Sequence, residues 1–291
     1  MLEISKVNKG FNERAVLKNI NLVVQNGEIV GLLGKNGAGK STLIKCVNQL
    51  YRFQGEIRVN NVSYRENPST YLKNVGILLE PSYFDYMTAM DNLRAYASLN
   101  GIRFKDVESE IKELLGVIGL GDAMQMQVKE FSFGMKQKLG VAMALVKKPD
   151  VLVLDEPTIG VDPKGLDAMF DILRNLAIKH NIAIIFSSNN LKEVQDVSNK
   201  ISFLKDGEII QTIETSKMLG LENLYTISVR DPISPELRLD LDKSGNVVLC
   251  ETKISINNYE NLNRVIKLLV KYGNPILDIE RENKFLRDFY D

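Results

Sequence analysis

An eight-residue glycine-rich segment, GKNGAGKS at residues 34–41, decides much of how this chain can fold. It fits the pattern G-x-x-x-x-G-K-[ST]. The run before it, EIVGLLG, is typical of a buried strand, and the run after it, KSTLIKCVNQL, has the apolar spacing of an amphipathic helix. A glycine turn between a strand and a helix presents backbone N–H groups and a positive helix end to an anion. The segment therefore predicts a phosphate-binding loop in an α/β core.

The positions of this loop have distinct predicted roles. Lys40 would neutralise the β- and γ-phosphates of a nucleotide, and the Ser41 hydroxyl would bind Mg²⁺. The glycines would let backbone N–H groups approach the phosphate oxygens closely. The predicted phosphate contacts are Gly34, Lys35, Asn36, Gly37, Ala38, Gly39, Lys40, Ser41 and Thr42.

A second segment, VLVLDEP at residues 151–157, supplies carboxylates. Its four apolar residues predict a core strand, and the strand ends at Asp155 and Glu156. Open α/β sheets bind ligands at the carboxyl ends of their strands, so both side chains should lie near the phosphates. Asp155 suits the Mg²⁺ shell, directly or through water. Glu156 would orient the attacking water or take a proton from it.

Apolar strands alternate with amphipathic helices through most of the chain. Strands are expected at 75–80, 151–155 and 182–188, with a helix over roughly 165–179 between the last two. Residues 88–130 are expected to be mostly helical, with Thr88 and Asp91 as a capping box, and another helix should start near Ser132. This alternation predicts a largely parallel α/β core. The helical stretch at about 83–148 would be a subdomain inserted into it.

Local patterns make finer predictions. The strand VLKNINLVV is followed by Asn26-Gly27, a strong hairpin signal, and ISFLKDGEII is expected to form a second hairpin. Leu43, Ile44, Val47 and Leu50 should share one face of the first helix, and Met135, Leu139, Met143 and Val146 one face of the helix after Ser132. After about residue 214, the runs YTISVR, VVLC, KISINN and PILDIERE predict strands and NLNRVIKLLVKYG a helix. Residues 215–291 therefore predict a small α+β appendage.

Charge and cysteine content narrow the setting. The chain has 37 basic and 37 acidic residues, so we expect no general attraction to nucleic acid and no nucleic-acid partner. Its 2 cysteines form neither a disulfide framework nor a metal pattern, which favours a reduced, cytosolic compartment. The first residues lack the apolar stretch of a signal peptide. No run reaches the ~20 apolar residues that span a bilayer, so another chain would have to cross a membrane.

Three further motifs carry a specific resemblance. FSFGMKQKLGVAMAL at 131–145 resembles the LSGGQ signature and the helix behind it, and IGVD at 159–162 resembles the D-loop. Phe11 stands where the same family places an aromatic ring against adenine. Over residues 1 to about 215, the chain resembles the nucleotide-binding subunit of an ATP-binding-cassette (ABC) transporter. The resemblance implies an α/β fold with an ABC-type P-loop NTPase core at 1–214, the helical subdomain at about 83–148 and an accessory α+β domain at 215–291.

The resemblance also implies a mechanism. Two cassettes, identical or different, would close head to tail around two ATP molecules with Mg²⁺. Ser132 and Gly134 would then present helix N–H groups to the γ-phosphate bound by the opposite cassette. Asp162, in the D-loop, would belong to the same nucleotide site. A separate membrane-spanning subunit would hold the chain at the cytoplasmic face of the cell membrane.

The strand end IIFSSNN departs from the family pattern. The family usually places a histidine that contacts the γ-phosphate where this chain has Asn189. Asparagine can donate a hydrogen bond to phosphate but cannot exchange a proton or carry charge. Loss of one transition-state contact costs roughly 10²–10³ in rate. Asn189 therefore argues for slow turnover, whereas the retained Glu156 argues for residual hydrolysis. The single histidine, His180, precedes the strand and is expected to lie at a helix end without a catalytic role.

Two other motifs differ from the family, the Q-loop at one position and the signature at two. Glu80 stands where the Q-loop usually has glutamine, and its carboxylate can still bind water or Mg²⁺. A glutamate here resembles the variant of lantibiotic-immunity and bacitracin-resistance transporters. In the signature, Phe133 replaces the first glycine and Met135 the glutamine. Phe133 would crowd or pack against the opposing cassette, so it would affect a partner's site as well.

These observations support one main function and two alternatives. The main prediction is an ATP-hydrolysing exporter motor, and resemblance suggests an amphipathic or antimicrobial peptide, or a peptide toxin, as cargo. Residues 80–92, with Pro81, Tyr83, Phe84, Tyr86 and Met87, are a candidate groove for a membrane subunit's cytoplasmic helix; the alternative is that these aromatics belong to the core of the subdomain. One alternative is a regulatory half of an unequal cassette pair, motivated by Asn189 and Phe133. The other is a non-transport ATPase of DNA repair or translation; only 113 residues separate Ser41 from Asp155, and no coiled coil or second cassette is present.

Overall fold

A computed structural model describes the chain except for residues 13, 80–81, 219–222, 244–246, 257–258 and 284–291. The chain divides into two compact units, Met1–Thr215 and Ser216–Asp291. Helix α8 (Thr215–Met218) begins at the division between them. Each unit has its own buried core and is described by itself.

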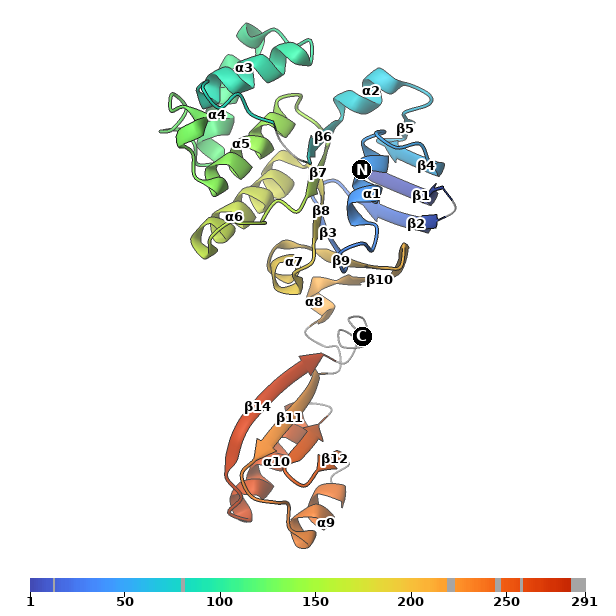
Figure 1. Ribbon diagram of the computed structural model, residues 1–291, viewed down its shortest axis with the longest axis vertical. Helices are drawn as coiled ribbons and strands as arrows, with labels where there is room; N and C mark the ends of the chain where they lie inside the picture. Colours follow the sequence, from blue (N-terminus) through green and yellow to red (C-terminus); the bar gives the residue numbers. More distant parts are fainter. Residues whose placement is uncertain (13, 80–81, 219–222, 244–246, 257–258, 284–291) are drawn as a thin grey trace. The chain divides into compact units, whose positions relative to one another are not determined.

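The centre of the first unit is a six-stranded sheet (Figure 1). Its strands, in spatial order, are β10 (Glu208–Glu214), β9 (Lys200–Lys205), β3 (Ile29–Leu33), β8 (Ala183–Ser188), β7 (Val151–Asp155) and β6 (Val75–Leu78). The strands from β9 to β6 are parallel, and only β10 pairs antiparallel. β3 and β8 are buried along their whole length, which explains why they appear in the sequence as continuous apolar runs.

Two layers cover this sheet (Figure 1). Helix α1 (Lys40–Val47) lies on one side with an antiparallel sheet of β1 (Leu2–Phe11), β2 (Arg14–Val24), β4 (Gln54–Val59) and β5 (Val62–Ser63). Helix α2 (Pro68–Lys73) follows β5. Helices α6 (Pro163–His180) and α7 (Leu191–Val197) cover the other side. A Cβ at Gly31 of β3 would lie 2.1 Å from Val194 Cγ1, so α7 sits directly on this glycine.

The segment between β6 and β7 carries three helices that group together (Figure 1). They are α3 (Ala89–Leu99), α4 (Glu108–Val117) and α5 (Phe133–Leu145), with short 3₁₀ turns at Phe104–Asp106 and Val128–Glu130. Thr88 is the N-cap of α3, as half of the predicted capping box: its Oγ1 accepts from the Asp91 N–H at 3.0 Å and donates to the Asp91 carboxylate at 2.9 Å. Buried Ile111, Leu115 and Ile118 form an apolar stripe along α4 and its C-terminal end.

The second unit is an α+β layer of its own. Its antiparallel sheet has the order β12 (Val247–Cys250), β13 (Lys253–Ile256), β11 (Asn223–Val229) and β14 (Ile276–Asn283). Helices α9 (Pro235–Lys243) and α10 (Tyr259–Lys271) contribute Leu237, Leu241, Val265 and Leu269 to a core that includes Ile227 of the sheet.

The α/β P-loop fold class predicted from the sequence is confirmed, with local corrections. Asn26-Gly27 makes a turn but no hairpin, because β2 and β3 belong to different sheets. Leu50 is exposed because α1 ends at Val47, and α5 buries small residues outside the predicted stripe. Within the described ranges, no helix is both long and apolar enough to cross a membrane.

Candidate active site

Three neighbouring strands end at the same edge of the central sheet. The register pairs Leu33 of β3 with Ser188 of β8, and Ser187 of β8 with Asp155 of β7. The loop that follows β3 therefore begins beside the polar ends of β8 and β7. Parallel strands bring their carboxyl ends together in this way, and this edge is where open α/β sheets bind ligands.

The glycine-rich loop needs its glycines for two different reasons. Gly37 and Gly39 have φ values of 83° and 112°, a region that side-chain-bearing residues rarely adopt. A Cβ at Gly34 would lie 2.5 Å from the Leu204 carbonyl oxygen, so the loop packs against the end of β9 there. Around Gly37, in contrast, a Cβ would meet nothing within 4 Å. The loop is anchored at its start and open at its middle, as a phosphate cradle requires.

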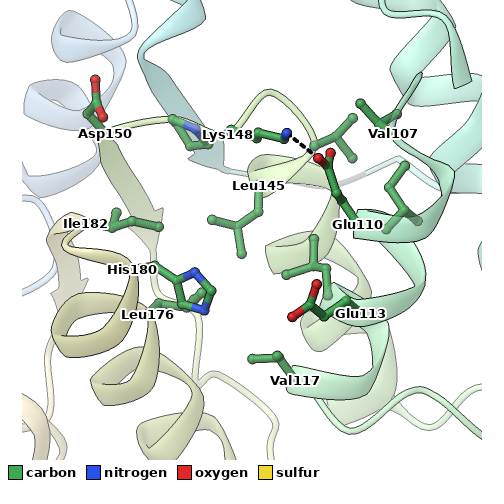
Figure 2. A pocket seen from close by; sticks show the side chains of 14 residues that line it. Val107, Glu110, Glu113, Val117, Leu145, Lys148, Asp150, Leu176, His180 and Ile182 are labelled. Atoms are coloured by element: carbon green, nitrogen blue, oxygen red, sulfur yellow. Dashed lines mark ion pairs between the residues drawn. The ribbon is translucent and has the colours of Figure 1, made fainter.

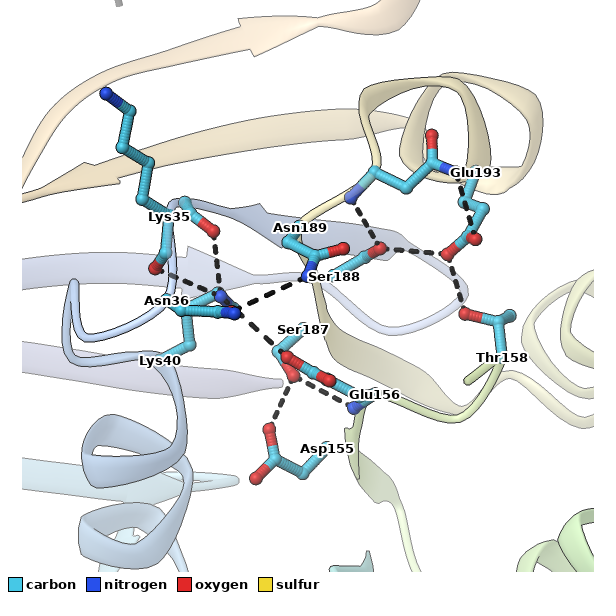
Figure 3. Close-up of polar contacts among 12 residues, drawn as sticks. Lys35, Asn36, Lys40, Asp155, Glu156, Thr158, Ser187, Ser188, Asn189 and Glu193 are labelled. Carbon is cyan, nitrogen blue, oxygen red and sulfur yellow. Dashed lines mark hydrogen bonds and ion pairs between the residues drawn. The ribbon is translucent and has the colours of Figure 1, made fainter. Parts of the chain in front are cut away.

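Lys40 folds back across this loop (Figure 3). Its Nζ donates to the carbonyl oxygens of Gly34 at 2.7 Å and Lys35 at 3.3 Å, and lies 3.9 Å from Glu156 Oε1. The residue is only 4% exposed. Burial lowers the pKa of Lys40 below its ordinary value, and the negative charges of Glu156 and Asp155 oppose that shift. Partial desolvation strengthens the attraction between the Lys40 ammonium and a polyphosphate, and the two carboxylates oppose it.

Ser187 holds the acidic end of β7 and was not singled out from the sequence. Its hydroxyl donates to Asp155 Oδ1 at 2.5 Å and accepts from the Glu156 N–H at 2.9 Å. Glu156 has φ +47°, which is uncommon for a residue with a side chain. Ser187 therefore orients one carboxylate and supports the unusual backbone of the next residue. The two serines at the end of an apolar strand were the only sequence signal for it.

Asn189 lies beside the phosphate loop (Figure 3). Its Nδ2 is 3.5 Å from Asn36 Oδ1, across 153 residues of sequence. The structure thus brings together Asn36, Lys40, Glu156 and Asn189, which the sequence predicted separately. Glu80, the other predicted catalytic or metal-binding carboxylate, lies outside the described residues.

Comparison with known proteins identifies the family. The sequence model described as "ABC transporter" matches residues 17–159. Bacitracin transport ATP-binding protein BcrA of Bacillus licheniformis is 29% identical, over 100% of this chain and 96% of that protein. Lantibiotic transport ATP-binding protein SrtF of Streptococcus pyogenes is 35% identical, over 77% of this chain and 96% of that protein. This chain belongs to the ABC transporter ATP-binding family.

A solved structure supports the same assignment. The ATP-binding subunit of an ABC transporter aligns with a TM-score of 0.66 and 27% identity, over 75% of this chain and 91% of that chain. ABC ATP-binding domains are ATPases that use ATP with Mg²⁺, and in transporters they dimerise and pair with membrane subunits.

The donor set of this ABC subunit fits a magnesium ion that arrives with its nucleotide. Within the described parts of the chain, no group of three or more His, Cys, Asp or Glu residues could hold a metal by itself. Ser41, exposed on the first turn of α1, and Asp155 offer one hydroxyl and one carboxylate. Mg²⁺ is commonly held by one or two carboxylates together with substrate phosphates. These two residues would hold it here.

Phe11 is available for the adenine contact predicted from the family. Its ring meets Tyr51 edge-on, with centroids 5.1 Å apart and an interplanar angle of 80°. Lys9 Nζ lies 4.5 Å from the centroid of the Phe11 ring, and Phe11 remains 40% exposed. A planar base can stack on a ring held in this way.

The signature and D-loop meet within this chain. Ser132 caps α5, because its hydroxyl accepts from the Met135 N–H at 3.2 Å, and Gly134 lies on the first turn of that helix. Asp162 is the N-cap residue of α6. A Cβ at Gly160 would lie 3.0 Å from Phe133 Cε1, so the Phe133 ring packs over the D-loop glycine. Phe133 is still 49% exposed, which leaves part of the ring for another contact.

His180 lies in a different part of the ABC subunit. It ends α6 and lines a cavity of about 350 Å³ with residues of α4 and α5 (Figure 2). The cavity has an apolar lining with polar groups such as the Lys148–Glu110 ion pair of 2.6 Å. None of its lining residues is a predicted nucleotide contact. The expectation that His180 ends a helix is met; its lack of a catalytic role stays a prediction.

Proposed function

We propose that this chain is the ATP-hydrolysing motor of a peptide exporter. It would bind Mg-ATP, dimerise with a second cassette and drive an amphipathic or antimicrobial peptide through a separate membrane subunit. The main support for this proposal is the position of Glu156. Its backbone N–H is bonded by the Ser187 hydroxyl, and its carboxylate lies beside Lys40 of the phosphate loop. A carboxylate in that place can orient or deprotonate a water next to the γ-phosphate.

Sequence relatives support the cargo class. The proteins named for bacitracin transport and lantibiotic transport both align with this chain over 96% of their own length. The bacitracin relative also covers 100% of this chain, including the second unit. Both names refer to peptide antibiotics, so a peptide of that kind is the cargo we propose.

A groove beside residues 82–88 supports docking of a membrane subunit. A cavity of about 330 Å³ is lined by Phe84, Tyr96, Leu99 and Met143 among others. Phe84 is 51% exposed, although buried Asn92 fixes its backbone by accepting from the Phe84 N–H at 2.8 Å and donating to its carbonyl at 3.1 Å. An exposed aromatic on a fixed backbone is a good anchor for a partner helix.

The same stretch touches the signature helix. Tyr83 OH donates to the Lys136 carbonyl oxygen at 2.5 Å, and Lys136 Nζ lies 3.1 Å from Asp85 Oδ1. Lys136 belongs to α5, whose first turn carries the signature residues. A partner bound at 82–88 would therefore press on the helix that faces the second cassette.

Asn189 favours a second candidate function, a regulatory cassette with little hydrolysis of its own. An amide beside the phosphate loop can hold a phosphate oxygen without exchanging a proton. In this candidate the chain would still bind ATP and dimerise. It would leave turnover to a different cassette.

Turnover of Mg-ATP by the purified chain separates the two candidates. Wild type and Glu156→Gln should be measured together, with dimerisation followed in the same samples. Turnover by wild type that is lost in Glu156→Gln would support the motor. ATP-dependent dimers of both proteins without turnover, also after addition of the membrane subunit, would favour the regulatory cassette.

Docking and cargo need their own tests. Phe84→Glu should reduce co-purification with the membrane subunit, whereas Ile178→Glu, at a residue 77% exposed on α6, should not. Cells that lack the chain should lose tolerance of a bacitracin- or lantibiotic-type peptide, and the wild-type chain should restore tolerance where Glu156→Gln does not. Unchanged co-purification of Phe84→Glu would contradict the docking site, and equal tolerance with and without the chain would contradict the cargo.

A further inference from the structure

Glu193, on the first turn of α7, joins two loops of the site (Figure 3). Its Oε2 accepts from Thr158 Oγ1 at 2.6 Å and from Ser188 Oγ at 2.8 Å. Its Oε1 accepts from Asn190 Nδ2 at 3.1 Å. Both carboxylate oxygens are therefore used: Thr158 lies in the loop after β7, Ser188 is the last residue of β8 and Asn190 is the N-cap residue of α7.

These loops carry the two residues on which hydrolysis would depend. Thr158 follows Glu156 by two positions, and Ser188 and Asn190 stand on either side of Asn189. Thr158 and Ser188 are 5% and 3% exposed, so their hydroxyls depend on an acceptor inside the protein. Ser188 Oγ also accepts from the Asn190 N–H at 3.0 Å, which closes the turn around Asn189.

We propose that Glu193 is a positioning residue for ATP hydrolysis, holding the Glu156–Thr158 turn and the Asn189 loop in register. This inference rests on the motor function proposed above. Glu193 would not touch the nucleotide. It would act through the relative placement of Glu156 and Asn189.

An ionised carboxylate suits this place better than any neutral side chain. It has acceptor capacity on both oxygens and bonds to it are stronger than neutral ones. Glutamine has the same shape, but its NH₂ group would face a donor at one of the two ends. Glu193→Gln therefore weakens the connection without removing the volume of the side chain.

The backbone of Glu156 explains why such a connection matters. With φ +47°, this residue sits in a conformation that its surroundings must maintain. The Ser187 hydroxyl supports this residue by accepting from the Glu156 N–H, and Glu193 supports the turn two residues later by accepting from the Thr158 hydroxyl. Displacement of a catalytic group by about 1 Å can cost on the order of 10²-fold in rate.

The test is a double-mutant cycle in which kcat, KM and ATP affinity are measured for wild type, Glu193→Gln, Thr158→Val and the double variant. Asp196→Asn is the control. Asp196 is an exposed acid on the same helix. Each single variant should lower kcat roughly 10–100-fold, with KM and ATP affinity changed less than about threefold because the phosphate loop is intact. The double variant should be no slower than the slower single variant. Thr158→Ser, which retains the hydroxyl, should keep near wild-type kcat.

Hydrogen exchange provides a readout that does not need turnover. The Ile159, Val161 and Asn190 amides should exchange faster in Glu193→Gln and Thr158→Val, and those of residues 35–40 should not. If wild type binds ATP without hydrolysing it, the motor function fails, and the exchange result still decides whether Glu193 joins the loops. Unchanged exchange, or additive kcat losses in the double variant, would overturn the inference. If Glu193→Gln does not fold, Thr158→Val against Thr158→Ser decides.

Discussion

Replacing Ser187 by alanine should lower both the turnover of ATP and the stability of the fold, and comparison with a control variant should separate the two effects. The side chain is fully buried, and its hydroxyl makes the two bonds that hold Asp155 and the Glu156 N–H. Alanine leaves the part-buried Glu156 N–H without this acceptor and removes a charge-assisted bond of 2.5 Å. We expect the free energy of unfolding to fall by about 1–3 kcal/mol.

The effect on turnover should be larger than this loss of stability suggests. Without Ser187, neither the Asp155 carboxylate nor the left-handed Glu156 backbone is fixed, so both can move by a fraction of an ångström or more. We expect kcat for Mg-ATP to fall roughly 10–100-fold. ATP affinity should change little, because Lys40 and the loop N–H groups remain.

Ser202→Ala is the matched control for this variant. Ser202 is also fully buried in the central sheet, and its hydroxyl lies 2.9 Å from Thr212 Oγ1, away from the phosphate loop. It should cost about 1 kcal/mol of stability and leave kcat within about twofold. Urea unfolding and phosphate release on the three proteins make the comparison. Equal turnover of Ser187→Ala and Ser202→Ala would refute the role given to Ser187.

Three further predictions concern other parts of the chain. Burial raises the pKa of Tyr71 to about 12, and its neutral hydroxyl donates to the Val47 carbonyl at 2.6 Å. This raised pKa stabilises the fold below pH 10 and does so progressively less between pH 10 and pH 12. Between pH 9 and 11, urea unfolding should therefore show that wild type loses on the order of 1 kcal/mol more stability than Tyr71→Phe. Gly160→Ala should lower the free energy of unfolding by about 1–2 kcal/mol, because φ of Gly160 is +72° and the new Cβ would meet the Phe133 ring. In a Phe133→Ala background, thermal unfolding should show a smaller but still present loss, because the backbone strain remains. Mg²⁺ alone should not shift the Tm, whereas the Tm shift caused by ATP should shrink when EDTA is added, because the described part of the chain has no cluster of carboxylates or imidazoles for a resident metal.

The elements that sequence reasoning predicted best are those with local causes. β3, β7 and β8 are parallel and buried, so each appears as an unbroken apolar run. The helix starts at Thr88 and Ser132 follow from hydroxyls that bond the backbone three residues later.

The errors and omissions have non-local causes. Asn26-Gly27 has the chemistry of a hairpin turn, but pairing of β3 with β8 and β9 draws the next strand into another sheet. The contact of Ser187 with Asp155 depends on the register of β7 with β8, which no local pattern reveals. The proximity of Asn189 to Asn36 depends on the same sheet order.

Two of the departures from the family pattern, at Asn189 and Phe133, are connected through one short turn. Residues 158–161 form a turn that is closed by a hydrogen bond of 3.2 Å from the Val161 N–H to the Thr158 carbonyl oxygen. One end of this turn is tied through Glu193 to the loop of Asn189, and Gly160 near the other end lies under the Phe133 ring. In an ABC dimer, the signature residues beside Phe133 would face the nucleotide of the other cassette. A rearrangement at Asn189 would therefore reach the neighbouring site through contacts inside this chain. Asparagine at 189 and phenylalanine at 133 would then both act on one series of contacts between the two nucleotide sites. The two positions therefore have to be tested together.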